Sequence, residues 1–246
     1  MKETRGIMGM PITVEVVGGD ATLLESVFAY FKEVDERFST YKENSEISKI
    51  NRGELQEGEY SPHMREVFAL AEKTKQETNG FFDIKTPVGL LDPSGIVKGW
   101  AIQNAAELLK EREVQNFCIE AGGDIQTSGK NEEGGEWSVG IRNPFNPSEI
   151  IKVLYPKGRG VATSGSYARG AHIYNPHNKE ASPSYWASIT VLGPNVLEAD
   201  RFATAAFAMG QEGAAFIEQL PGFEAYAIDQ NGIATITGGF GVYTCV

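Results

Sequence analysis

The sequence predicts an α+β fold in a single domain. Segments that alternate between apolar and polar residues, as strands do, lie among segments with the period of about 3.6 residues that marks amphipathic helices. Their order shows no regular strand–helix–strand alternation, which favours α+β over α/β. The chain has 246 residues, of which 41% are hydrophobic, and this suffices for a large core. Because no repeat or linker divides the chain, we expect one domain over residues 1–246.

The first elements are expected to be a strand and a long helix. Residues 12–17 alternate and are rich in β-branched side chains, which favours a strand. Asp20 is well placed to cap the helix that follows. The apolar residues of that helix recur at helical spacing and form one face: Leu24, Val27, Phe28, Phe31, Val34 and Phe38.

Two more long helices and a strand are expected in the middle of the chain, after a short helical turn at 46–50. The Ser-Pro pair at 61–62 is typical of a helix start, and the Asn-Gly pair at 79–80 of a helix end. The next helix is expected over residues 97–111, followed by a strand at 117–120 that runs into Ala-Gly-Gly-Asp.

The second half is expected to hold most of the strands and two further helices. Strands are expected at residues 137–141, 150–155, 161–164, 172–174 and 186–192. Asn195 is placed to cap a helix over residues 196–209, and another helix is expected at 212–220. Residues 223–228 and 233–236 are expected to pair as a closing hairpin around Asp-Gln-Asn-Gly.

The charge balance excludes some classes of partner. The chain has 22 Lys and Arg against 33 Asp and Glu, a net charge of −11, so nucleic acid is not an expected partner. No apolar run approaches the roughly 18 residues needed to span a bilayer, and the N-terminus has no signal-peptide core. We therefore expect no transmembrane segment and a cytoplasmic location, unless a leader has been removed. An anionic ligand would need a metal, helix N-termini or a few placed cations.

Two segments are candidates for holding phosphate. Residues 92–99 form a turn that runs into a helix, and Lys98 adds a cation near its N-terminus, where phosphates bind. The alternative is an ordinary turn with an exposed lysine. In residues 120–124, paired glycines permit close backbone approach or an anion-binding nest. The alternative there is a tight turn with an exposed aspartate.

Asp200 and Thr204 are candidates for binding a metal. They are one helical turn apart on an Ala- and Phe-rich helix and so share a face. A buried carboxylate and hydroxyl are costly unless they have a partner, and two such oxygens suit Mg²⁺. The alternative is an ion pair of Asp200 with Arg201 or with a lysine.

Residues 161–176 combine hydroxyls, glycines, an arginine and a histidine, a mixture that suits a loop around a phosphate-bearing ligand. Within it, His172 is a candidate acid–base group or phosphate donor, although a lone histidine is more often a plain hydrogen-bonded residue. His177 is expected to be an exposed residue at the periphery.

Segments spread along nearly the whole chain resemble, in the same order, the ApbE family of FAD:protein FMN transferases. They are Met8-Gly-Met-Pro, residues 38–47, Gly80-Phe-Phe-Asp83, residues 92–99 with 120–124, and residues 163–176 with Ala199–Thr204.

This resemblance implies a T-fold-like α+β architecture with mostly antiparallel sheets and a Mg²⁺-dependent transferase. Such an enzyme moves the FMN moiety of FAD to a Thr or Ser hydroxyl of an acceptor flavoprotein and releases AMP. By motif, the metal ligands are the Gly95 carbonyl, Asp200 and Thr204, while His172 and Asp200 are the catalytic residues. The residues implied to line the FAD site are Met8, Tyr41, Phe81, Phe82, Asp83, Asp92, Lys98 and Ile173.

The chain departs from the family pattern at Gln103 and Asn175, where acidic residues are usual. Three other functions stay open at this point. The first is an FAD pyrophosphatase that gives FMN and AMP, the second a non-catalytic flavin-binding protein, and the third an unrelated α+β domain.

Overall fold

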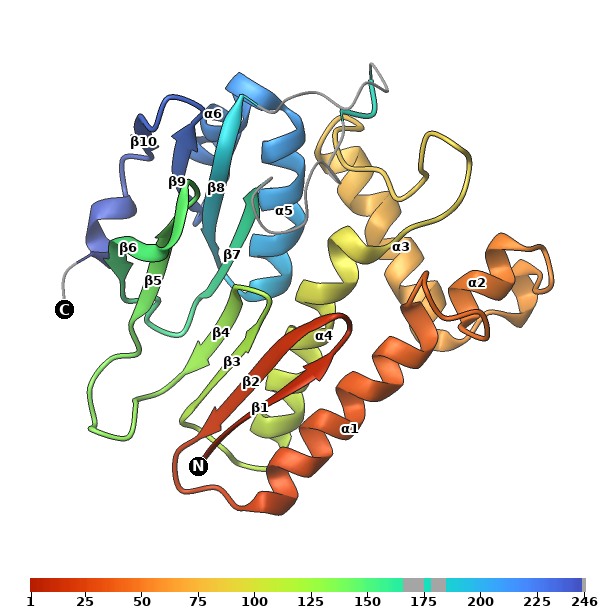
Figure 1. Ribbon diagram of the computed structural model, residues 1–246, viewed down its shortest axis with the longest axis horizontal. Coiled ribbons are helices and arrows are strands. Elements are labelled where there is room, and N and C mark those ends of the chain that lie inside the picture. The colour runs from red at the N-terminus through yellow and green to blue at the C-terminus, as the bar shows by residue number, and fades with distance from the viewer. Residues whose placement is uncertain (166–174, 178–184, 245–246) are drawn as a thin grey trace.

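The computed structural model describes residues 1–165, 175–177 and 185–244, in which eight strands form one large antiparallel sheet with helices on one face (Figure 1). Within these residues the strand order is β1-β2-β3-β4-β7-β8-β9-β10, and every neighbouring pair is antiparallel. The predicted α+β class with mostly antiparallel strands is thus confirmed. The strands are β1 (Lys2–Ile7), β2 (Met10–Val16), β3 (Phe117–Ala121), β4 (Asp124–Ser128), β7 (Gly160–Gly165), β8 (Trp186–Gly193), β9 (Glu224–Asp229) and β10 (Ala234–Ile236).

Helices α1 and α5 begin at the caps that the sequence indicated. Asp20 accepts from the Leu23 backbone N–H, and Asn195 accepts from that of Glu198. The helices are α1 (Ala21–Phe38), α2 (Glu46–Asn51), α3 (Pro62–Glu77), α4 (Ser94–Glu111), α5 (Val196–Ala208) and α6 (Gly213–Glu218), with 3₁₀ turns at 57–59, 210–212 and 240–243. None of the described helices is long and apolar enough to cross a membrane.

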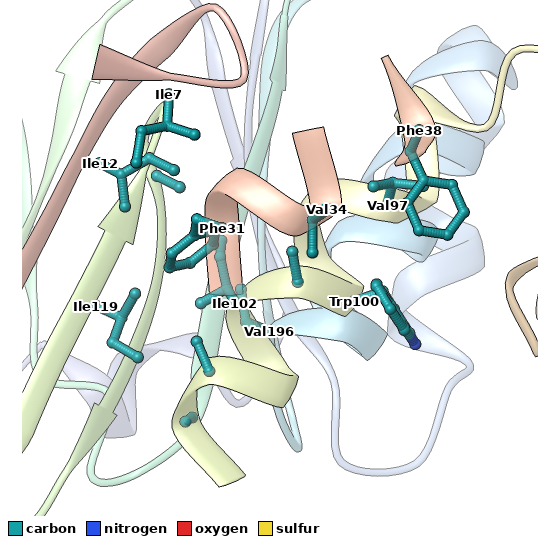
Figure 2. Close-up of a cluster of buried hydrophobic side chains, with 14 of the residues drawn as sticks. Ile7, Ile12, Phe31, Val34, Phe38, Val97, Trp100, Ile102, Ile119 and Val196 are labelled. Atoms are coloured by element: carbon teal, nitrogen blue, oxygen red, sulfur yellow. The ribbon is translucent and has the colours of Figure 1, made fainter. Parts of the chain in front are cut away.

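The main core lies between the sheet and helices α1 and α4. Figure 2 shows Phe31 of α1 and Ile102 of α4 facing Ile12 and Ile119 of the sheet, and all four side chains are fully buried. The Trp100 ring completes the contact with α1, where it meets Phe38 edge to face with ring centroids 5.5 Å apart. Burial of these apolar faces fixes α4 in place.

The opposite face of the sheet is partly covered by a separate two-stranded hairpin of β5 (Val139–Asn143) and β6 (Asn146–Leu154). The hairpin packs against the sheet through a smaller apolar cluster. Its buried members are Val139, Ile141, Leu154, Val161, Leu192 and Phe240. The uncovered space between hairpin and sheet becomes part of the candidate site.

The structure differs from the sequence prediction at two strands and at one helix start. Strands β1 and β4 were not expected, and α4 begins at Ser94 rather than near Val97. The closing hairpin is confirmed as β9 and β10. The strand expected at 172–174 lies outside the described residues.

Candidate functional site

Helices α4 and α5 cross in close contact, and Gly99 makes this contact possible. A Cβ atom at Gly99 would lie 2.7 Å from the Cβ of Asp200 and 3.0 Å from the Val196 carbonyl oxygen. A larger residue therefore has no room there unless α5 moves. The Gly99 backbone N–H donates a hydrogen bond to Oδ2 of Asp200 at 2.8 Å. The crossing thus holds the Asp200 carboxylate against the beginning of α4.

Thr204 faces α4 from the next turn of α5. Its hydroxyl lies 3.5 Å from the Gly95 carbonyl oxygen. Asp200 and Thr204 therefore share the helix face that the sequence predicted. A carboxylate, a hydroxyl and a backbone carbonyl come together here, and these are oxygen donors of the kind that hard divalent cations prefer.

Lys98 lies beside this group and contacts two carboxylates. Its ammonium is 2.7 Å from Oδ2 of Asp124 and 3.6 Å from Oδ1 of Asp200. Asp124 is fully buried, and its Oδ1 accepts a hydrogen bond from the Thr163 backbone N–H at 3.1 Å. The Lys98 side chain is 16% exposed. The alternatives of an exposed aspartate and an exposed lysine are therefore wrong.

This cluster has two carboxyl groups, those of Asp124 and Asp200, for the one ammonium of Lys98. Burial raises the pKa of the Asp200 carboxyl to about 7, Lys98 opposes this effect, and Asp124 adds to it. A buried carboxylate that is held above its usual pKa gains from a nearby cation. A further positive charge bound beside Asp200 would therefore stabilise its carboxylate form.

Arg201 takes no part in the cluster. Its guanidinium pairs with Glu77 of α3 and, at 2.5 Å, with Glu198, and it stacks on the Phe202 ring at 4.1 Å. The alternative of an Asp200–Arg201 pair is thus wrong. The alternative contact with a lysine is present, through Lys98, beside the oxygen cluster rather than in place of it.

The cluster lies at the wall of a cavity of about 1040 Å³, at the upper end of the roughly 300–1,000 Å³ typical of small-molecule sites. The cavity extends from the start of α4, past the Gly122–Gly123 turn, to the β5–β6 hairpin. A dinucleotide therefore has room beside the Lys98 ammonium.

Most of the expected site residues that the structure describes line this cavity. They are Phe81, Phe82, Asp83, Asp92, Gly95, Lys98, Asp200 and Thr204. Two others are not among its lining residues. Tyr41 follows α1 and is 97% exposed, and Met8 lies in the β1–β2 turn against the main core. His172 and Ile173 lie outside the described residues.

The acidic residues at this end of the cavity are fixed by local bonds. Oδ1 of Asp92 accepts from the Ser94 backbone N–H at 3.0 Å, which orders the turn before α4. Oδ1 of Asp83 accepts from the Lys85 backbone N–H at 2.8 Å, and its Oδ2 pairs with Lys75 at 2.7 Å. Both carboxylates are therefore held in defined positions at the edge of the site.

His177 is exposed, as the sequence predicted, but it lies close to the cavity. Its ring meets that of the cavity-lining Phe81 edge to face, with centroids 4.5 Å apart. This contact joins residues far apart in the chain, which sequence spacing does not reveal.

Sequence reasoning missed the wall on the hairpin side. Trp137, Val139 and Ile141 line the cavity there, and Cys118 of β3 lines it from the large sheet. Burial raises the pKa of the Cys118 thiol to about 12, so this cysteine is an unreactive part of the wall. The alternation within these strands was the signal available, because it distinguishes one face of each strand from the other.

The residues present fit Mg²⁺ better than a transition metal. Within the described ranges, no three His, Cys, Asp or Glu side chains gather as metal ligands. The oxygen atoms available to a cation are instead those of Asp200, the Thr204 hydroxyl and the Gly95 carbonyl, a set small enough to leave places for water or phosphate oxygens. Mg²⁺ is commonly bound in this way.

Known proteins resemble this chain along most of its length. Residues 8–87 and 85–227 match the sequence model of the ApbE family. The FAD:protein FMN transferase of Haemophilus influenzae is 27% identical over an alignment that spans 86% of this chain and 80% of that protein. The enzyme of the same name from Escherichia coli K12 is 26% identical over 70% of this chain, but the match covers 54% of its length.

Solved structures agree with this assignment at the level of the fold. The flavin transferase ApbE of Vibrio cholerae superposes with a TM-score of 0.86 and 21% identity, covering 99% of this chain and 98% of that one. The ApbE protein of Thermotoga maritima gives a TM-score of 0.87 at 20% identity, covering 100% and 99%. Since the family match takes in most of the sequence, this chain belongs to the ApbE family.

Proposed function

We propose that this protein transfers the FMN moiety of FAD to a Thr or Ser hydroxyl of an acceptor protein, with Mg²⁺ as cofactor and AMP as the second product. The observation that carries the proposal is the group of Lys98, Asp200 and Thr204 at the wall of a cavity large enough for a dinucleotide. Membership of the ApbE family, whose relatives are named for this activity, supports the substrate.

The reaction exchanges one phosphorus–oxygen bond for another. The acceptor hydroxyl oxygen bonds to the FMN phosphorus, the diphosphate bond to that phosphorus breaks, and AMP leaves with the bridging oxygen. The hydroxyl proton passes to a base, for which His172 is the candidate. Transfer of this kind depends mainly on positioning and on neutralising charge at phosphorus.

The residues of this chain supply most of that environment. The Lys98 ammonium provides a fixed positive charge beside the diphosphate. Asp200, Thr204 and the Gly95 carbonyl would hold Mg²⁺, which when bound neutralises phosphate charge as a Lewis acid. The Gly122–Gly123 turn, with φ of 58° and 95°, lets backbone approach the ligand without a Cβ in the way.

The deciding experiment compares the fate of FAD with and without an acceptor. Purified protein is incubated with FAD and Mg²⁺, alone and with candidate flavoprotein acceptors, and FMN, AMP and acceptor mass are measured. AMP release that depends on an acceptor, together with an acceptor mass raised by one FMN, supports transfer. Rapid FMN and AMP release without acceptor would instead identify an FAD pyrophosphatase. FAD binding with no turnover under any condition would identify a flavin-binding protein.

A further inference from the structure

Asp124 connects three separate parts of the site although it is completely buried. It is the first residue of β4, directly after the Gly122–Gly123 turn. One carboxylate oxygen accepts from the Thr163 N–H of β7 at 3.1 Å, and the other lies 2.7 Å from the Lys98 ammonium of α4. A buried charge is kept only where its partners repay the loss of solvation.

Lys98 is shared unequally between two carboxylates. Its ammonium is 2.7 Å from Asp124 and 3.6 Å from Asp200, so the stronger contact is with Asp124. Asp200 also accepts from the Gly99 N–H, and its carboxyl lies within hydrogen-bonding reach of the Asp124 carboxyl. If the Asp124 charge were absent, the ammonium would be drawn towards Asp200, because attraction between charges rises steeply at short distance in a buried site.

We propose that Asp124 is a positioning residue that holds the Lys98 ammonium away from Asp200 and so leaves the Asp200 carboxylate available to a divalent cation. This inference rests on the proposed function, because it takes Asp200 as a ligand of the cation. Lysine and metal then occupy neighbouring places beside the diphosphate. Without Asp124, the same lysine would compete with the metal for one carboxylate.

The substitution Asp124→Asn separates this role from a purely structural one. The asparagine carbonyl oxygen still accepts the Thr163 N–H bond, so the link between β4 and β7 is kept. The amide group that replaces Oδ2 has no charge and cannot accept from an ammonium. The variant therefore removes the hold on Lys98 while it disturbs the strands little.

The test is Mn²⁺ binding, measured by electron paramagnetic resonance on the whole chain without FAD. Mn²⁺ accepts the same oxygen ligands as Mg²⁺. We expect Asp124→Asn to weaken Mn²⁺ binding by about tenfold or more, because the Lys98 ammonium would then lie against the Asp200 carboxylate and compete with the metal. The double variant Asp124→Asn/Lys98→Met should recover to within about threefold of wild type, because the competing cation is gone.

The recovery in the double variant carries the proposal, since loss of a structural residue would not be repaired by a second substitution. Circular dichroism and melting temperature establish that each variant is folded. If Asp124→Asn does not fold, Lys98→Met alone decides: it should bind Mn²⁺ at least as tightly as wild type.

Three outcomes would overturn the proposal. Asp124→Asn binds Mn²⁺ as wild type does, or the double variant stays as weak as Asp124→Asn, or Lys98→Met loses Mn²⁺ binding. Absence of Mn²⁺ binding in the wild type would be a different failure, because it would remove the metal from the proposed function as well.

Discussion

Helix α4 meets two of its neighbouring helices, α1 and α5, in opposite ways. Towards α1 it presents a large apolar surface, in which the fully buried Trp100 ring packs on Phe38. Towards α5 it presents Gly99 and Lys98, which face the buried carboxylate of Asp200. The first contact stabilises the fold through apolar burial, whereas the second brings buried charges together at a cost to stability. Helix α4 thus has one side that packs in the apolar core and another side that carries part of the candidate site.

Among the substitutions on the α5 side of α4, Asp200→Asn should have the largest effect on activity. We expect FMN transfer to fall by about a thousandfold, because charge stabilisation at phosphorus is lost. The folded state should be as stable as wild type or more so, since a buried carboxylate with raised pKa is removed and the amide oxygen still accepts from Gly99. Acceptor-dependent AMP release and a urea titration measure the two effects. The exposed Glu212, just past α5, gives a matched control in Glu212→Gln, which should change neither.

Trp100→Ala removes a side chain from the apolar side of α4, which packs against α1. We expect the free energy of unfolding to fall by about 3–5 kcal/mol, as for other large buried aromatic residues cut back to alanine. In conditions where the variant remains folded, its activity should stay close to that of wild type. Urea unfolding followed by fluorescence or circular dichroism gives the first value. A loss of activity in fully folded Trp100→Ala would show that the two sides of α4 are not independent.

Gly99→Ala tests how closely the site depends on the helix crossing. The added methyl group would lie 2.7 Å from the Cβ of Asp200, so we expect a loss of about 1–3 kcal/mol in stability. Activity should fall further than stability alone explains, because Asp200 is displaced. Gly58, whose Cβ would meet nothing within 4 Å, supplies the control Gly58→Ala. Equal effects of the two substitutions on activity would contradict the role given to the crossing.

The pH dependence of Mg²⁺ binding should be the smallest of these effects. The pKa of Asp200 is raised to about 7 by burial, so a proton must leave before a cation binds. Below this pH, Mg²⁺ affinity should fall by up to about tenfold per pH unit, measured by calorimetry in buffers of different ionisation enthalpy. Binding at pH 6 without proton release would contradict this expectation.

The same raised pKa changes the stability of the metal-free protein in the opposite direction. Between pH of about 4 and about 7, native Asp200 keeps its proton while an unfolded aspartate has lost it. The unfolded state then binds fewer protons, so this group makes the free energy of unfolding fall as pH rises through that window. Asp200→Asn should remove this part of the slope in urea titrations at several pH values.

The sequence predicted those parts of the molecule that depend on local patterns. Caps such as Asp20 and Asn195 located helices, because a side-chain acceptor at a helix start is a local feature. The pair Asp200 and Thr204 was found because helical spacing alone puts them on one face. The start of α4 was missed because its N-cap is Pro93, which offers no side-chain cap, and the Asp92 turn before it resembles an ordinary loop.

The parts that depend on distant pairing could not be predicted in this way. Strand β4 was missed because two of its inward residues are polar: Asp124 meets Lys98, and Gln126 accepts from the Val196 N–H at the start of α5. Strand β1 was missed because it is a half-exposed edge with little apolar alternation. The Lys98–Asp124 pair exists only because the β3–β4 turn brings β4 under α4. The residues next to Lys98 and next to Asp124 in the sequence give no sign that these two side chains form an ion pair.

The β5–β6 hairpin is an insertion between β4 and β7, yet these two strands pair directly, as in the Ile125–Val161 register. The continuity of the sheet therefore does not run through the hairpin, although the hairpin forms a wall of the cavity. A change in its length or sequence would therefore leave the strand order of the large sheet as it is, and it would not alter the helix that carries Asp200 and Thr204. Replacing the hairpin would therefore change one wall of the cavity while the order of the sheet strands is kept.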